Sequence, residues 1–187
     1  DPIVDLSLFR ERSFAIGSVL IFITGFVLYS SSALLPILVQ THYGYDATLA
    51  GLVLSPGAVC VLFLMPVSGK LVSKIPSRYM VLFGLFCCWL GCFLSSTHIN
   101  PDLDYKSFVW LRAIQMLGLP FLFIPISTLA FMNVPKEKST RASSLFSLMR
   151  NLGGSVGIAI VTTLVARGSQ QHQAFLTGRL QAGNFVY

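Results

Sequence analysis

The stretch Phe14–Val39 reads FAIGSVLIFITGFVLYSSSALLPILV and contains no Asp, Glu, Lys or Arg. As an α-helix rising ~1.5 Å per residue, it is long enough to cross the ~30 Å hydrocarbon core of a bilayer. Four further stretches are mostly apolar, and the third of the five is the shortest. The sequence therefore predicts an all-α membrane protein, a polytopic transmembrane helix bundle of about five helices in a single domain. The predicted spans are Phe14–Val39, Leu49–Val67, Tyr79–Leu94, Ser107–Met132 and Ala142–Ala166.

Composition and the placement of charge support a membrane location. Hydrophobic residues make up 54% of the chain and charged residues 11%, against about 25% charged in soluble domains. The net charge of +6 does not indicate nucleic acid, because the cations alternate between gaps rather than clustering with aromatics on one polar face. This alternation is the positive-inside pattern of a multi-pass protein of the inner (cytoplasmic) membrane. Eight of the thirteen Lys and Arg residues lie in the gaps predicted to be cytoplasmic: Arg10, Arg12, Lys70, Lys74, Arg78, Lys136, Lys138 and Arg141.

The same bias predicts the topology. The start of the chain and the loops 68–78 and 134–141 are expected inside, whereas the loops 41–48 and 98–106 are expected outside. The odd number of spans leaves residues 167–187 as an external polar tail. The chain also begins at Asp1, without an initiator Met or the n-region of a signal peptide. We therefore expect a piece of a longer membrane protein.

The first span carries more polar residues than the others. Gly25, Tyr29, Ser32 and Pro36 follow one another at intervals of four, three and four residues, which places them on one helix face. Polar groups inside a membrane usually face the bundle interior or a wet cavity. Serine hydroxyls also bond to carbonyls of their own helix. Tyr29 and Ser32 are therefore candidates for cavity-lining residues, and the alternative that the polar groups bond within their own helix stays open.

The third span is apolar on nearly all sides and is predicted to be a peripheral helix that faces lipid. Three of the four cysteines, Cys87, Cys88 and Cys92, lie in it. They are interpreted as small apolar side chains. Because no His or acid lies beside Cys88 and Cys92, the sequence predicts no metal site.

The fourth span contains a cation, Arg112, three residues before Gln115. A cation at the centre of a bilayer costs roughly 2.5–3.5 kcal/mol on insertion scales. Arg112 lies close enough to the predicted outer boundary to extend to the headgroups instead. We favour an inward orientation, because Gln115 on the same face can hydrogen-bond the same partner.

The fifth span has a face of small residues. Gly153 and Gly157 form a G-x-x-x-G pair beside Gly154, and such pairs allow two helix backbones to approach closely. Helix packing is the preferred interpretation of these glycines. Arg150 in the same span is either interfacial or near mid-depth, and we leave this choice open.

The residues that catalysis would need do not fall inside the spans. No Asp or Glu occurs in any predicted span, and His42, His98 and His172 lie in predicted outer segments. An intramembrane hydrolase would need paired carboxylates or a His cluster in the bilayer. We therefore predict no enzyme, no catalytic residue, no cofactor and no metal, and we do not expect this chain to carry protons by itself.

Three motifs in order resemble the major facilitator superfamily. The loop Gly69–Arg78 (GKLVSKIPSR) resembles the G-x-L-x-D-R-x-x-x-R loop between the second and third helices of a half of such a transporter. The run Leu111–Gly118 (LRAIQMLG) resembles R-x-x-Q-G-x-G on the fourth helix, with Met116 in place of a glycine. Arg150–Gly157 (RNLGGSVG) is similar to the fifth helix in the C-terminal half of fourteen-span drug:proton antiporters of the EmrB/QacA type.

This resemblance implies a C-terminal-half fragment, helices nine to thirteen of fourteen. It implies that the first and fourth helices line the central cavity, that the third lies outside, and that Gly69, Lys74 and Arg78 belong to a gating loop. Ser73 replaces the usual Asp of that loop, so we expect no carboxylate-based lock here. The coupling carboxylate for protons is expected in the other half.

The function implied by the resemblance is multidrug efflux and antibiotic resistance through a proton-coupled secondary active transporter. Its substrates would be small amphipathic or cationic compounds, and Tyr29, Ser32, Arg112, Gln115 and Arg150 are the candidates for the substrate cavity. A periplasmic adaptor is a possible partner at the external tail. Three alternatives stay open: a non-transporting membrane scaffold subunit, a passive channel, and an exporter of siderophores or lipids.

Overall fold

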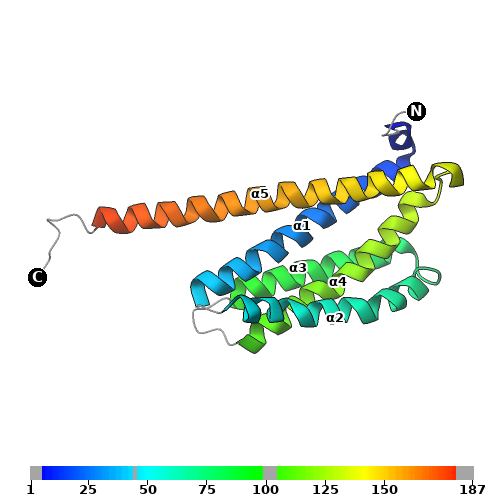
Figure 1. The fold of residues 1–187 in the computed structure, drawn as a ribbon. Coiled ribbons are helices and arrows are strands. Elements are labelled where there is room, and N and C mark those ends of the chain that lie inside the picture. The colour runs from blue at the N-terminus through cyan, green and yellow to red at the C-terminus, as the bar shows by residue number, and fades with distance from the viewer. Residues whose placement is uncertain (1–5, 44–45, 99–104, 180–187) are drawn as a thin grey trace, which may run out of the picture.

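The computed structural model describes residues 6–43, 46–98 and 105–179, and almost all of them are helical (Figure 1). Five of the helices in these ranges are long and apolar enough to cross a membrane, as the sequence predicts. Two short 3₁₀ helices accompany them. The elements are η1 (Leu6–Arg10), α1 (Arg12–Tyr43), α2 (Ala47–Leu71), α3 (Ser77–His98), α4 (Tyr105–Phe131), η2 (Lys136–Lys138) and α5 (Ser139–Arg179).

The helices run alternately up and down. The start of α1, the α2–α3 turn and the α4–α5 turn lie at one end of the molecule, and α5 runs away from that end (Figure 1). All eight cations predicted to be cytoplasmic lie in η1, in these turns or in the helix ends that adjoin them. We call this end the basic end.

An aromatic cluster closes the basic end. The Phe14 ring is fully buried and lies 5.7 Å from the Phe9 ring and 6.3 Å from the Phe131 ring, centroid to centroid. Phe131 in turn contacts Phe146 at 5.4 Å. Leu8 of η1 is 3% exposed and belongs to the same core. Leu8 and Phe9 of η1 therefore pack into the bundle.

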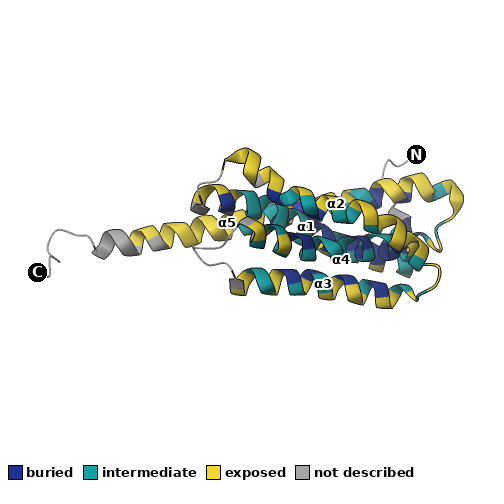
Figure 2. Cartoon of the chain, turned by 90° about the horizontal axis from the view of Figure 1, so that it is seen from below, coloured by how far each residue is buried: buried dark blue, intermediate teal, exposed yellow. Residues whose placement is uncertain are grey.

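The helices form two packed groups that meet at α1 and α4. α1 packs along α5, whereas α4 lies between α2 and α3 and also contacts α1. Buried residues face the neighbouring helices, while the outer surfaces are exposed (Figure 2). In each span, only 12% to 39% of the 18-residue apolar stretch is buried inside the bundle. Most of the apolar surface is therefore left for lipid or for other protein segments.

The fifth helix is longer than its predicted span. The prediction ends the span at Ala166 and treats 167–187 as a polar tail, but α5 continues as a helix to Arg179; residues 180–187 lie outside the described ranges. No proline follows Pro135, and Gly168 alone costs only about 1 kcal/mol in a helix. The change from apolar to polar residues therefore does not end the helix.

A side-chain hydrogen bond from Ser68 joins α2 to α4. Ser68 is fully buried, and its hydroxyl donates to the backbone carbonyl of Pro120 over 2.8 Å. Hydrogen bonds between membrane helices contribute about 0.6 kcal/mol on average and up to about 1.7. This bond therefore fixes the register of the two helices more than it stabilises them.

Replacing Ser68 by alanine is expected to lower the unfolding free energy of the full-length protein by about 0.5–1.5 kcal/mol. The matched control is Ser55→Ala, because Ser55 is exposed and its hydroxyl donates within α2 to Gly51. Thermal unfolding in detergent measures both. Equal effects of the two substitutions would contradict a role for the Ser68–Pro120 bond.

Candidate functional site

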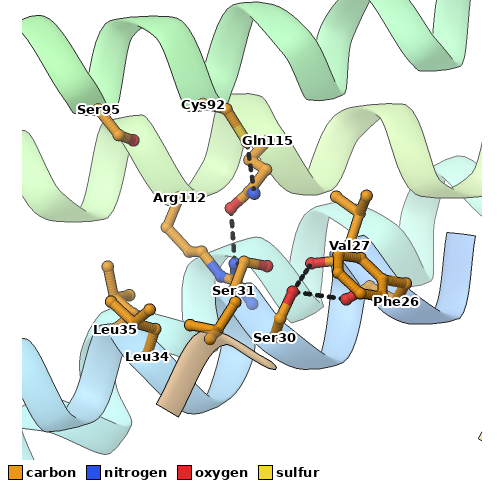
Figure 3. Close-up of a pocket in the computed structure, with 11 residues that line it drawn as sticks. Phe26, Val27, Ser30, Ser31, Leu34, Leu35, Cys92, Ser95, Arg112 and Gln115 are labelled. Carbon is orange, nitrogen blue, oxygen red and sulfur yellow. Dashed lines mark hydrogen bonds between the residues drawn. The ribbon is translucent and has the colours of Figure 1, made fainter. Parts of the chain in front are cut away.

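Arg112 lies inside the bundle, between α1 and α4. It is 2% exposed, so it points inward and does not extend to the headgroups. Its Nη1 donates to Gln115 Oε1 over 2.6 Å and to Ser31 Oγ over 3.1 Å, and its Nη2 donates to Ser32 Oγ. Figure 3 shows Arg112 and Gln115 reaching from α4 toward Ser31 on α1. The predicted pair Arg112 and Gln115 therefore links two helices.

Gln115 extends the cluster to α3. Its Nε2 donates to Cys92 Sγ over 3.3 Å, and its backbone carbonyl accepts from the Cys88 thiol over 3.7 Å. We call Ser31, Ser32, Cys92, Arg112 and Gln115 the Arg112 cluster. It joins side chains from three helices, α1, α3 and α4.

A pocket of about 300 Å³ lies beside this cluster. Its walls are largely apolar side chains of α1, and Val161 of α5 also contributes. Ser95 of α3 points toward it (Figure 3). The lining residues are Phe26, Val27, Ser30, Ser31, Leu34, Leu35, Cys92, Ser95, Arg112, Gln115 and Val161.

The guanidinium of Arg112 is paired with neutral groups only. Its hydrogen-bond partners in the described ranges are two hydroxyls and one amide oxygen. Its Nε is buried and has no hydrogen-bond partner among the described residues. A cation held in this way keeps its positive charge uncompensated, so the cluster favours negative charge or further polar groups nearby.

Both interpretations of the serines in α1 apply. The Ser30 hydroxyl donates to Phe26 O, and the Ser31 hydroxyl donates to Leu28 O over 3.0 Å. Ser31 also accepts from Arg112, and Ser32 accepts from Arg112 as well. The predicted Ser32 therefore lies at the cluster, and Ser31 is an additional member.

Tyr29 does not lie at the Arg112 cluster. Its ring contacts Gly154 of α5, where a Cβ on that glycine would meet the ring. It lines a separate cavity of about 210 Å³ with Asn151, Ser155 and other α5 residues. Tyr29 and Arg112 therefore line different cavities. The reason is that α1 contacts α5 along one side and α4 along another.

Arg150 lies at the junction of α1, α4 and α5. Its Cζ is 5.2 Å from the centroid of the Phe123 ring, and its backbone carbonyl packs against Gly25. A cation over an aromatic face is stabilised by the ring quadrupole. Its Nε is buried without a partner in the described ranges. Arg150 is therefore a second inward cation, apart from the Arg112 cluster.

The three packing glycines of α5 face α1. A Cβ on Gly153 would meet the backbone of Phe22, one on Gly157 the backbone of Phe26, and one on Gly154 the ring of Tyr29. All three are buried. The G-x-x-x-G pair is thus placed where two helix backbones are in direct contact.

The residues of the predicted gating loop lie at the basic end. Gly69 has open space where a Cβ would be, and Lys74 and Arg78 are exposed. None of them lines the pocket beside Arg112. The Ser73 hydroxyl donates to Lys70 O over 2.8 Å.

Sequence reasoning missed Ser31, Cys92 and Ser95 as neighbours of Arg112. Ser31 belongs to the polar run Ser30–Ser32, but the helical period favours Ser32 on the predicted face. Cys92 and Ser95 lie on the helix predicted to face lipid. Their spacing of three residues puts them on one face, and this is the only local signal for them.

A bundle of five helices long and apolar enough to span a membrane, with a polar cluster linking three of them, defines a multi-pass membrane protein. Residues 2–171 match the family model described as the Major Facilitator Superfamily. The chain belongs to this superfamily and is a multi-pass protein of the inner membrane.

Several similar proteins are multidrug exporters by name. The chain is 35% identical to the multidrug export protein EmrB of Escherichia coli over 95% of its own length and 35% of that protein. It is 32% identical to the probable multidrug resistance protein EmrY of the same species, over 100% of the chain and 36% of the relative. It is 33% identical to the fatty acid resistance protein FarB of Neisseria gonorrhoeae, over 91% of the chain and 34% of the relative. The chain thus spans about a third of the length of these relatives.

Proposed function

We propose that this chain is part of a secondary active transporter that exports amphipathic toxic compounds in exchange for protons. The relatives named multidrug export and fatty acid resistance proteins support this substrate class. Rocking of one half of the transporter against the other around a mid-membrane site provides alternating access. In this scheme Arg112 ties α1 to α4, so that the two helices move together.

The observation that carries the proposal is the burial of Arg112. Placing a cation within the membrane costs roughly 2.5–3.5 kcal/mol on insertion scales, and the chain meets this cost with hydroxyl and amide partners from two helices. A scaffold subunit has no need of such a group, since packing glycines alone hold helices together. The buried cation therefore favours a transporter over a scaffold.

Charge in this chain favours neutral or anionic substrates over cationic ones. Its predicted spans contain Arg112 and Arg150 and no Asp or Glu. The carboxylate needed for protons, or for a cationic substrate, is proposed to lie in the part of the protein outside this chain. A periplasmic adaptor would meet the polar end of α5, residues 167–179.

The test is transport by the full-length protein in liposomes with an imposed pH gradient. We expect efflux of an amphipathic fluorescent dye, and this efflux should stop when a protonophore collapses the gradient. A medium-chain fatty acid should inhibit it. Dye flux that ignores the gradient would indicate a passive channel. The absence of any dye or proton movement would favour a scaffold. Efflux that a siderophore inhibits, and a fatty acid does not, would change the substrate class.

A further inference from the structure

Three cations surround the turn that joins α2 to α3. Lys70, Lys74 and Arg78 are all exposed, and the segment 68–79 contains no Asp or Glu. The turn is compact, because the Lys74 amide donates to Leu71 O over 2.9 Å and Ser73 Oγ donates to Lys70 O over 2.8 Å. We call these three residues the cationic turn.

The cationic turn has no acidic partner in the part of the chain that the structure describes. Arg78 instead contacts its neighbour Tyr79: Nη2 donates to the phenol oxygen over 3.1 Å, and Cζ lies 4.7 Å from the ring centroid. Tyr79 itself is 52% exposed. Tyrosine is enriched at membrane–water interfaces, so this pair marks the headgroup level.

A stripe of exposed apolar residues continues from Arg78 along α3. The stripe consists of Leu82, Phe86, Trp89 and Phe93, which follow Arg78 at intervals of four, four, three and four residues and so share its face. Their exposed fractions are 61%, 56%, 58% and 49%. The Trp89 ring lies 6.1 Å from the Phe86 ring and is stacked on the Phe93 ring at 5.3 Å. We call this set the aromatic stripe.

We propose that the cationic turn and the aromatic stripe form a binding site for one anionic phospholipid. The phosphate pairs with Lys74 and Arg78, and an acyl chain lies along the aromatic stripe. The charge decides the lipid class: a zwitterionic lipid carries its own cation beside the phosphate, whereas an anionic lipid leaves its negative charge to be paired by the protein. The site lies on the helix predicted to be peripheral and does not depend on the transport function.

The test is native mass spectrometry of the full-length protein with equal amounts of phosphatidylglycerol and phosphatidylcholine. We expect phosphatidylglycerol adducts to dominate by roughly tenfold, because each basic residue near an anionic surface strengthens the association a few-fold. The double substitution Lys74→Gln/Arg78→Gln should remove most of this preference. Both side chains are exposed, so these variants are expected to fold; Lys74→Gln alone, in the turn, serves if the double variant does not.

The matched control is Lys136→Gln/Arg141→Gln, which removes the same charge from exposed positions at the same basic end but away from the aromatic stripe. It should keep the preference. An equal loss in both double variants would show diffuse attraction to the basic end and would overturn the site. Equal binding of the two lipids by the unaltered protein would also overturn it. Displacement of the lipid by inorganic phosphate would show a site for the phosphate ion alone.

Discussion

Replacing Gly153 with alanine is expected to lower the unfolding free energy of the full-length protein by about 1–3 kcal/mol, the usual range for overpacking. The added Cβ would meet the carbonyl oxygen and Cα of Phe22 on α1. These are backbone atoms, so no side chain can turn away to make room. The α1 and α5 backbones would have to move apart along the whole contact. Thermal unfolding in detergent measures the change.

The matched control lies in the same helix. Gly168 has open space where its Cβ would be, so Gly168→Ala should leave stability unchanged or raise it by up to about 1 kcal/mol through helix propensity. Gly25→Ala is expected to push α1 and α5 apart in the same way. Gly25 lies on α1, and a Cβ there would meet the backbone of Arg150 on α5. Equal stabilities of the Gly153 and Gly168 variants would show that α1 and α5 are not in backbone contact.

The number and type of the helices were predictable from the sequence because lipid imposes them. A backbone in hydrocarbon must satisfy its own hydrogen bonds, so a long apolar stretch there forms a helix. The ends of the helices were less predictable. Polar residues such as those after Arg167 remain helical when nothing terminates the helix, and hydropathy carries no information about this.

Helix partners were less predictable than the helices. The G-x-x-x-G pair at Gly153 and Gly157 indicates a close contact, but nothing local identifies α1 as the partner. Arg112 and Gln115 were found together because they are one helical turn apart on one helix. Ser31, which comes from another helix, was missed because its place depends on the register of α1 against α4. For the same reason, the sequence could not tell that Tyr29 lines a different cavity from Arg112.

Replacing Arg112 with alanine is expected to reduce dye efflux by the full-length protein at least tenfold while leaving its amount in the membrane unchanged. The substitution removes the hydrogen bonds to Ser31, Ser32 and Gln115, and hydrogen bonds to charged groups contribute about 1.5–3 kcal/mol each. It also removes the insertion cost of the cation, roughly 2.5–3.5 kcal/mol. These effects oppose each other, so the net loss of stability is expected to be smaller than the sum of the lost hydrogen bonds. Arg167→Ala, at an exposed position of α5, serves as the control and should transport normally.

Arg112→Lys separates the charge of this residue from its geometry. A lysine ammonium keeps the cation but lacks the planar fork with which the guanidinium reaches Gln115 and two hydroxyls at once. If the guanidinium acts by tying α1 to α4, the lysine variant should transport nearly as poorly as the alanine variant. If it acts only through its charge, the lysine variant should retain most of the transport. Full efflux by the alanine variant would remove Arg112 from the mechanism, whereas its loss from the membrane would reduce the role of Arg112 to folding.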